Sequence, residues 1–316
     1  MNFVDLCRGD FGRKVAYTGV DRITPQNVVK VVSDTIGIHN RNRTLIDYLY
    51  RYMKGDQPIL YRNKIVRPEV NNRVVENHAF ETVKFKAGQI CGEPIQYVCK
   101  KKNADKKINE QVDLLNDYLD EANADARNIQ RAIYQSATGT SYKAILKEED
   151  WTENGDLPPF RIFIPYPGDC YIVYSQRNGK PMLSVQILKD EDEQQYYLCY
   201  SKNQFFKITN GKVTEYGING FGGIPIVECP NNHDRLSDVE IAITLFDAIN
   251  KYQSDRLNGV EQFVQSFMKF KNCEVDKNEF LEMVKLGAIS VKDTGNGCQS
   301  DVELMTAELN QSESQV

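Results

Sequence analysis

The sequence predicts an α+β fold, in which helices and strands occupy different stretches of the chain, and three observations predict it. Apolar residues recur at helical spacing over much of the first 140 or so residues. Short strand-like segments separated by turn dipeptides follow, up to about residue 229. One unusually long helical pattern comes next, before a small strand–helix–strand pattern. Segregated helices and antiparallel strands are typical of α+β proteins.

The first part of the chain predicts an irregular N-terminal arm over residues 1–23 and then five helices. Thr24 can cap the first helix and Pro25 suits its first turn. Gly37 is expected to interrupt that helix, and Gly55 to end the second. The predicted helices cover residues 24–36, 41–54, 72–87, 108–122 and 124–138, and a short strand is expected at 95–98.

The middle of the chain predicts antiparallel meanders. Turn dipeptides of the Asn-Gly type stand at 154–155, 178–179 and 210–211, between short segments rich in β-formers. The predicted strands cover residues 141–146, 161–164, 170–174, 182–188, 195–201, 204–208 and 212–216, with a final apolar strand at 224–227.

A long helix is predicted from Ser237 to about Gln265. Ser237 and Glu240 have the spacing of a capping box. About 28 residues at 1.5 Å each span roughly 42 Å, well over twice the usual helix length. Such a helix indicates a spacer, a coiled-coil partner or a repeated wall in a ring. Its apolar side is Val239, Ala242, Phe246, Ile249, Tyr252, Val260, Phe263 and Phe267. Its polar side is Glu240, Thr244, Asp247, Lys251, Asp255, Asn258 and Gln262.

The C-terminal segment predicts strands at 267–275, 288–292 and 302–304 around a short helix at 278–285. The polar tail could begin another helix at its serines, so the natural chain is expected to continue past Val316.

Composition excludes several functional classes. The 316 residues are 41% hydrophobic and 26% charged, as in an ordinary folded protein. No run approaches the roughly 18 apolar residues of a membrane span, and the N-terminus lacks the layout of a signal peptide, so synthesis in a cytoplasm is expected. The net charge of −5 argues against a protein that reads DNA sequence, but not against one that handles DNA without gripping it.

Motifs for catalysis or for metal binding are not found in the sequence. The eight cysteines form no CxxC pair and the three histidines lack ligand spacing, so no metal or cofactor is expected. The glycine-rich 220–223 lacks the Lys and Ser/Thr of a phosphate loop. The acidic run 190–193 reads as a solvated hairpin tip, and the basic cluster 100–107 as a solvated loop or a contact for nucleic acid or an acidic partner. No enzymatic activity is expected.

Four stretches carry a resemblance to a known family. They are 48–55 (YLYRYMKG), the asparagine-rich 71–95 with its Gly-x-x-x-Gly-x-Pro-Ile turn, 223–232 (GIPIVE, then Asn-Asn), and 245–255 (LFDAINKYQSD). In this order they resemble the portal proteins, or head-to-tail connectors, of tailed bacteriophages, of the type common in phages of Gram-positive hosts. The resemblance covers about 24–275.

The resemblance implies a division of the chain. It predicts an α/β wing over 24–233, a stem helix over 234–266, a small α/β clip over 267–309 and the start of a truncated second stem helix over 310–316. Residues 1–23 match nothing in the family. The family's complete second stem helix, tunnel loop and crown are absent from this sequence.

The resemblance also implies a function. Portal subunits form a homo-oligomeric ring, usually of twelve, at the unique vertex of the capsid in the virion. Double-stranded DNA is packaged and ejected through the ring without sequence recognition. The implied partners are the terminase packaging motor, head-completion or adaptor proteins, and the major capsid and scaffolding proteins. A net acidic chain suits a channel, because many phosphate–lysine contacts would hold the DNA.

Two sets of residues become candidates under this interpretation. The polar side of the long helix is the candidate channel face, with Glu240, Thr244, Asp247, Lys251, Asp255, Asn258 and Gln262. Four clip residues are candidates for contact between subunits, or for a core within one chain: Phe267, Phe270, Phe280 and Met283.

Two other classes stay open. A coiled-coil interaction scaffold would need a sustained heptad pattern, which drifts here and meets Asn258-Gly259. A soluble α+β enzyme would need convergent titratable residues, which do not occur at a recognisable spacing.

Overall fold

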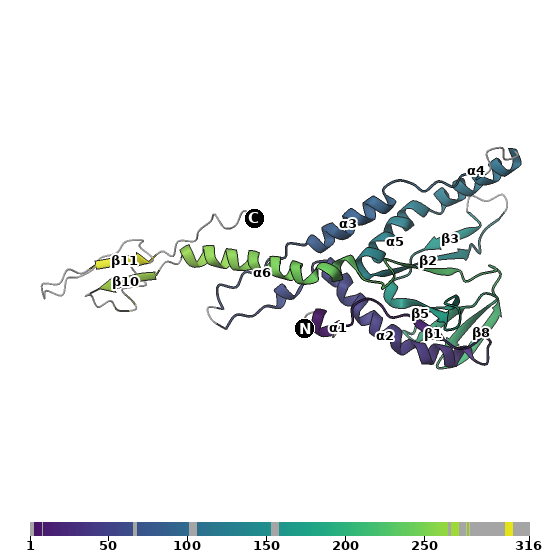
Figure 1. Cartoon of the computed structure of the whole chain (residues 1–316), viewed down its shortest axis with the longest axis horizontal. Coiled ribbons are helices and arrows are strands. Elements are labelled where there is room, and N and C mark those ends of the chain that lie inside the picture. Colours follow the sequence, from purple (N-terminus) through teal and green to yellow (C-terminus); the bar gives the residue numbers. More distant parts are fainter. Residues whose placement is uncertain are drawn as a thin grey trace. The chain divides into compact units, whose positions relative to one another are not determined.

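The computed structural model describes residues 3–7, 9–65, 68–100, 106–152, 158–264, 267–271, 276, 278 and 301–305. Its contacts divide the chain into two compact units (Figure 1). The first unit contains Met1–Tyr61 and Val75–Ala248, and the second contains Arg62–Val74 and Ile249–Val316. The mixture of helices and sheets confirms the predicted α+β class.

A six-stranded sheet in the order β1-β4-β5-β6-β7-β8 forms one layer of the first unit. Strands β4 to β8 are an antiparallel meander, as predicted, and only the short β1 pairs in parallel, with β4. The strands are β1 (Ala16–Thr18), β4 (Cys170–Ser175), β5 (Pro181–Lys189), β6 (Gln195–Tyr200), β7 (Gln204–Thr209) and β8 (Lys212–Ile218).

A smaller antiparallel sheet leads toward the long helix. Its central strand β2 (Thr140–Lys147) pairs with β3 (Phe160–Phe163) on one side and with β9 (Ile226–Pro230) on the other. The last strand begins two residues later than predicted, because Ala144 of β2 pairs with Ile226. Gly139, just before β2, has φ +85°, and a Cβ there would lie 2.0 Å from the Arg235 carbonyl oxygen. The chain can approach itself this closely only through glycine.

Five helices complete the first unit, besides the start of the long helix. They are α1 (Phe3–Cys7), α2 (Val28–Met53), α3 (His78–Cys91), α4 (Lys106–Glu121) and α5 (Ala124–Thr138), with short 3₁₀ turns η1 (Pro58–Tyr61) and η2 (Pro167–Asp169). The predicted interruption at Gly37 is wrong, because α2 continues through it. A glycine costs a helix only about 1 kcal/mol, and burial of apolar residues on both sides of it, such as Val32 and Leu49, outweighs that cost.

Two local predictions around α3 are also wrong. The helix begins at His78 rather than near residue 72, because the Asn77 side chain caps it by accepting the Phe80 N–H at 3.2 Å. Residues 95–98 form no strand. The Asn116 amide of α4 bonds both the N–H and the C=O of Tyr97, at 3.0 and 2.9 Å, so it replaces the ladder of a neighbouring strand.

Helix α2 belongs to both main cores of the first unit. Its first half, through Val28, Val31 and Val32, packs on the six-stranded sheet (Figure 1). Its second half, through Leu49 and Tyr52, packs with α1, α3, α5 and the beginning of the long helix. One rigid helix therefore links the sheet to the place where the long helix starts.

The N-terminal segment is more ordered than predicted. Residues 3–7 form α1, residues 16–18 form β1, and Phe3 is buried in the second core. A short helix without strong periodicity has little signal of its own, so only its packing against α2 reveals it.

The described strands of the second unit are β10 (Phe267–Lys271) and β11 (Asp301–Met305), which pair antiparallel. Both were predicted, and residues 272–275 of the first predicted strand lie outside the described residues. The predicted strand at 288–292 and, apart from Asn278, the helix at 278–285 lie outside the described residues.

Candidate functional site: the long helix and its anchors

The long helix α6 covers Asp238–Val264, in agreement with the prediction. Its 27 residues span about 40 Å at 1.5 Å per residue. The predicted capping box is present: the Ser237 hydroxyl accepts the N–H groups of Val239 and Glu240 at 3.0 and 3.4 Å, and the Glu240 carboxylate accepts the Ser237 N–H at 3.2 Å. The start of α6 is therefore specified by its own sequence.

A buried ion pair also anchors the first turn of α6. One nitrogen of Arg13, Nη2, donates to both Glu240 oxygens at 2.8 and 2.7 Å, and the Gly12 N–H donates to the same carboxylate at 2.8 Å. Arg13 is 4% exposed and Glu240 2%. Burial lowers the pKa of Arg13 below its ordinary value, and the charge of Glu240 opposes that shift. Glu240 was predicted on the channel face; in the single chain its carboxylate is buried against Arg13.

A second polar cluster joins α3 and α5 to the same turn. Lys86 of α3 donates to both Asp238 oxygens at 2.9 and 2.8 Å, and the Ser136 hydroxyl of α5 donates at 2.6 Å. A carboxylate at a helix N-terminus is also favoured by the helix dipole. Two independent groups of side chains thus hold the beginning of α6.

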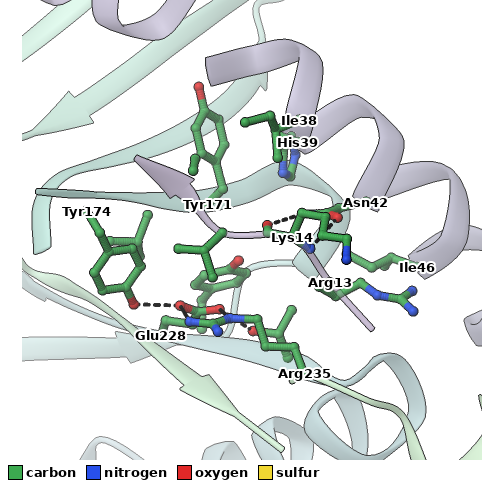
Figure 2. A pocket seen from close by; sticks show the side chains of 15 residues that line it. Arg13, Lys14, Ile38, His39, Asn42, Ile46, Tyr171, Tyr174, Glu228 and Arg235 are labelled. Atoms are coloured by element: carbon green, nitrogen blue, oxygen red, sulfur yellow. Dashed lines mark hydrogen bonds and ion pairs between the residues drawn. The ribbon is translucent and has the colours of Figure 1, made fainter. Parts of the chain in front are cut away.

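Figure 2 shows a third cluster, on the small sheet and the turn that precedes α6. Arg235 donates to the two oxygens of Glu228 at 2.8 and 3.0 Å, and the hydroxyls of Tyr174 and Thr140 donate at 2.5 and 2.9 Å. Burial raises the pKa of Glu228, but these hydrogen bonds outweigh it and leave the pKa below its ordinary value. The cluster ties β9 to β4 and to the turn.

The cavity at this cluster has a volume of about 20 Å³. Sites for organic ligands are usually of the order of 300–1,000 Å³. Together with the satisfied hydrogen bonds of Glu228, this small volume indicates a structural cluster.

The middle of α6 carries one more predicted residue. The Tyr52 hydroxyl of α2 donates to the Asp247 carboxylate at 2.8 Å, and Asp247 is half-buried. Burial raises the pKa of Asp247, and the bond from Tyr52 opposes the rise. The Asp247 carboxylate therefore helps to hold α6 against α2.

In the second unit, the polar residues of α6 face an extended segment, residues 71–74. The Asn258 side-chain oxygen accepts the backbone N–H and the side-chain amide of Asn72 at 2.7 and 3.1 Å. The Ser254 hydroxyl accepts the Val74 N–H at 3.0 Å. Asn258, predicted on the channel face, is 3% exposed in the single chain. These polar side chains are buried because they accept hydrogen bonds from the backbone N–H groups of Asn72 and Val74, which lie outside any strand.

An ion pair strengthens the same contact. Arg62 donates to Asp255 at 2.7 Å, and the Lys64 amine lies 3.9 Å away. Burial alone would raise the pKa of Asp255, but the hydrogen bond and charge of Arg62 outweigh it and keep the pKa below its ordinary value.

The exposed residues of α6 differ in part from those predicted. Thr244 and Lys251 are exposed, and Asp255 is exposed apart from its ion pair. The side chain of Gln262 lies outside the described part of the structure. Tyr252 and Val260, predicted on the packed side, are 54% and 52% exposed. In the first unit, Ile241 and Leu245 are also exposed, at 65% and 59%, so α6 presents apolar side chains to solvent.

The clip candidates are only partly described. Phe267 and Phe270 lie on β10, but their side chains are outside the described part of the structure. Phe280 and Met283 lie outside the described residues altogether.

A family model described as phage portal protein, SPP1 Gp6-like, matches residues 33–316. The chain belongs to this family of phage portal proteins. Portal proteins are structural proteins of the head-to-tail connector, form oligomeric rings at the capsid vertex, and interact there with the capsid and the terminase. No curated protein is similar enough to the chain to count as a match.

Several residues that anchor the portal helix were not singled out from the sequence. Arg13 and Gly12 lie before the matched range and in a segment without periodicity, so no local signal marks them. Asn72 and Ser254 stand in stretches that carried the family resemblance, and the structure gives both a physical role as hydrogen-bond partners along α6.

Two further findings concern this portal protein. Within the residues that the structure describes, no three His, Cys, Asp or Glu side chains gather closely enough to hold a metal ion. None of the described helices combines the length and the hydrophobicity that crossing a bilayer requires.

Proposed function

We propose that this chain is the subunit of a dodecameric portal ring at the unique capsid vertex, through which double-stranded DNA is packaged and ejected. The observation that carries the proposal is α6 within a portal-family chain: a 27-residue helix, firmly anchored at its first turn, that leaves Ile241 and Leu245 exposed. A helix with one anchored side and one apolar exposed side suits a wall made of repeated copies.

The proposed parts of the subunit follow the family pattern. The proposed wing is residues 24–233, the proposed stem helix 234–266 and the proposed clip 267–309. The two sheets and five helices of the first unit support a wing that carries the stem helix. The antiparallel pair of β10 and β11 supports a small clip.

The proposed channel face is smaller than the sequence indicated. Thr244, Lys251 and Asp255 support it by their exposure, and Gln262 continues the same spacing. Asp247 contributes at its edge, because its carboxylate already bonds Tyr52. The face carries few cations, so DNA would slide along it without many phosphate contacts to break.

The proposed subunit contact includes the exposed apolar side of α6. Ile241, Leu245 and Ala248 are spaced by four and three residues, so they lie on one side of the helix, and all are exposed in the single chain. Ring closure needs heterologous contacts, in which different surfaces of neighbouring copies meet. The clip residues Phe267, Phe270, Phe280 and Met283 are proposed to extend the contact.

The proposed partners are the terminase motor, head-completion or adaptor proteins, and the capsid and scaffolding proteins. We propose no catalytic step for the chain. The second candidate function is a coiled-coil scaffold, and the four-and-three spacing of Ile241, Leu245 and Ala248 favours it too.

The mass of the full-length gene product distinguishes the two candidates. Native mass spectrometry or light scattering, with electron microscopy of the same sample, is expected to show a ring of about twelve subunits with a central hole. A stable dimer would favour the coiled-coil scaffold. A stable monomer would contradict ring formation as an intrinsic property of the chain.

A further inference from the structure

The described residues 3–7 and 9–13, called the N-terminal arm from here on, are a part of the predicted 1–23 segment. They are inserted into the core of the first unit. Phe3 is 1% exposed and packs with Tyr48, their ring centroids 5.4 Å apart. Cys7 is buried in the same cluster, which also contains Val239 and Ile243 of α6. The arm thus covers apolar side chains at the beginning of the long helix, although it lies before the range that the family model matches.

The arm ends in the buried pair of Arg13 and Glu240, and that pair is incomplete. Only Nη2 of Arg13 reaches the carboxylate; within the described part of the chain, Nε and Nη1 are buried without a hydrogen-bond partner. Leaving buried donors unsatisfied is costly. The closed arm is therefore held by the ion pair through one nitrogen of Arg13, and the other two nitrogens have no hydrogen-bond partner among the described residues.

The structure also defines where such an opening would stop. The Asn42 side chain accepts the Lys14 N–H at 2.9 Å and donates to the Lys14 C=O at 2.7 Å. Strand β1 follows at once and pairs with β4. On the other side of this clamp, Gly9 and Gly12 have φ +77° and +80°, conformations that glycine adopts readily, and Gly12 packs closely against the Asp234 carbonyl. The contacts on the two sides of Lys14 are thus separable.

We propose that the N-terminal arm is a lock that opens as one unit, hinged next to Lys14, and thereby removes one of the two anchors of the first turn of α6, the Arg13–Glu240 pair. Lys86 still holds Asp238 in the open state, and the six-stranded sheet stays folded. Helix α1 has five residues, too few to be stable alone, so it unfolds when it leaves the core. Glu240 then loses Arg13 and Gly12, and the capping box loses its fixed carboxylate. The lock concerns one chain and does not depend on ring formation.

Hydrogen exchange of the unaltered protein tests the lock. Peptides covering residues 9–14 and 235–241 report the arm and the first turn, and peptides covering β5 and β6 report the sheet. We expect the first two to exchange together at low denaturant, at least tenfold faster than the strands, as in a sub-global opening. Equal rates for all four regions would overturn the proposal, because the arm would then be an inseparable part of the core.

The variant Arg13→Met provides the second test. Breaking a buried ion pair is strongly destabilising, on the order of a hundredfold or more in the opening equilibrium. If the lock exists, the open arm becomes the populated state: residues 9–14 and 235–241 lose protection, while β5 and β6 remain protected. A loss by the same factor in all regions would overturn the lock.

Arg177→Met is the matched control. Arg177 pairs with Asp21 at 3.0 Å, but both side chains are about four-fifths exposed, at 80% and 79%. Exposed pairs contribute little, so the control is expected to exchange like the unaltered protein in every region. A control that opened the arm as Arg13→Met does would overturn the assignment of the lock to the buried pair.

Discussion

His39 shows how a buried polar residue acts at the scale of one side chain. It is 2% exposed on α2, donates from Nε2 to the Gly168 carbonyl at 2.8 Å, and stacks on Tyr171 with ring centroids 4.6 Å apart. Burial is the main reason that its pKa falls from 6.5 to about 4. The ring is therefore neutral near pH 7, and the residue joins α2 to the sheet and to η2.

The His39 pKa leads to a pH prediction. The unfolded chain binds a proton at His39 below about pH 6.5, and the folded chain only below about pH 4. The stabilising contribution of neutral His39 to the free energy of unfolding is therefore complete above about pH 6.5 and is lost as the pH falls from 6.5 to about 4. The free energy of unfolding should fall by about 3 kcal/mol from this group. Urea unfolding of the protein and of His39→Gln at pH 7.5 and 4 measures it. Equal losses in both would contradict the assignment.

At the scale of one element, α6 is held by different chemistry along its length. Its beginning combines apolar packing with the buried pair of Arg13 and Glu240. In the second unit its buried side is polar, with Asn250, Ser254 and Asn258. Periodicity of apolar residues detects only the first kind of contact. This explains why the length of the helix was predicted well and its exposed face was not.

The polar contact between Asn72 and Asn258 in the second unit can be tested by mutation. Asn258→Ala removes the acceptor for the Asn72 N–H, and an unsatisfied buried donor costs about 1–3 kcal/mol. We expect amide exchange of residues 71–74 to become at least tenfold faster. Thr244→Ala, at an exposed position of the same helix, should change stability by less than about 0.5 kcal/mol. Unchanged exchange in Asn258→Ala would show that the segment is held by other contacts.

At the scale of the whole molecule, the single chain leaves substantial apolar surface uncovered. Helix α4 buries none of its residues, and Ile108, Leu114 and Leu115 on it are exposed. Ile241 and Leu245 on α6 are exposed as well. Large exposed apolar patches usually mark interaction surfaces, and the portal family assembles from many copies, so the chain has the properties of one part of an assembly.

Charged substitutions on α6 test this interpretation. Leu245→Glu is expected to prevent ring formation, because a carboxylate in a subunit contact loses its hydration, while the far-UV spectrum and melting temperature of the monomer stay unchanged. Lys251→Glu, on the proposed channel face, should leave the ring intact. Light scattering of the full-length variants measures the outcome. Normal rings from Leu245→Glu would exclude this side of α6 from the contact.

The sequence identified most elements because their signals are local. The strands β4 to β8 follow from alternation and Asn-Gly turns, and α6 from its periodicity and capping box. The start of α3 was predicted too early, and the strand predicted at 95–98 is wrong, since each place depends on one asparagine that bonds a neighbouring backbone. The ordered N-terminal segment was missed because it is stable only against α2 and α6.

By itself, the sequence determined the α+β class, the long helix with its capped start, and membership of the portal family through four ordered stretches. The tertiary structure alone decided which polar residues of α6 are buried, because Arg13 and Asn72, which satisfy Glu240 and Asn258, are more than 180 residues away in the chain. Burial of a charge or an amide depends on a partner brought there by folding, and such a partner leaves no pattern within the helix itself.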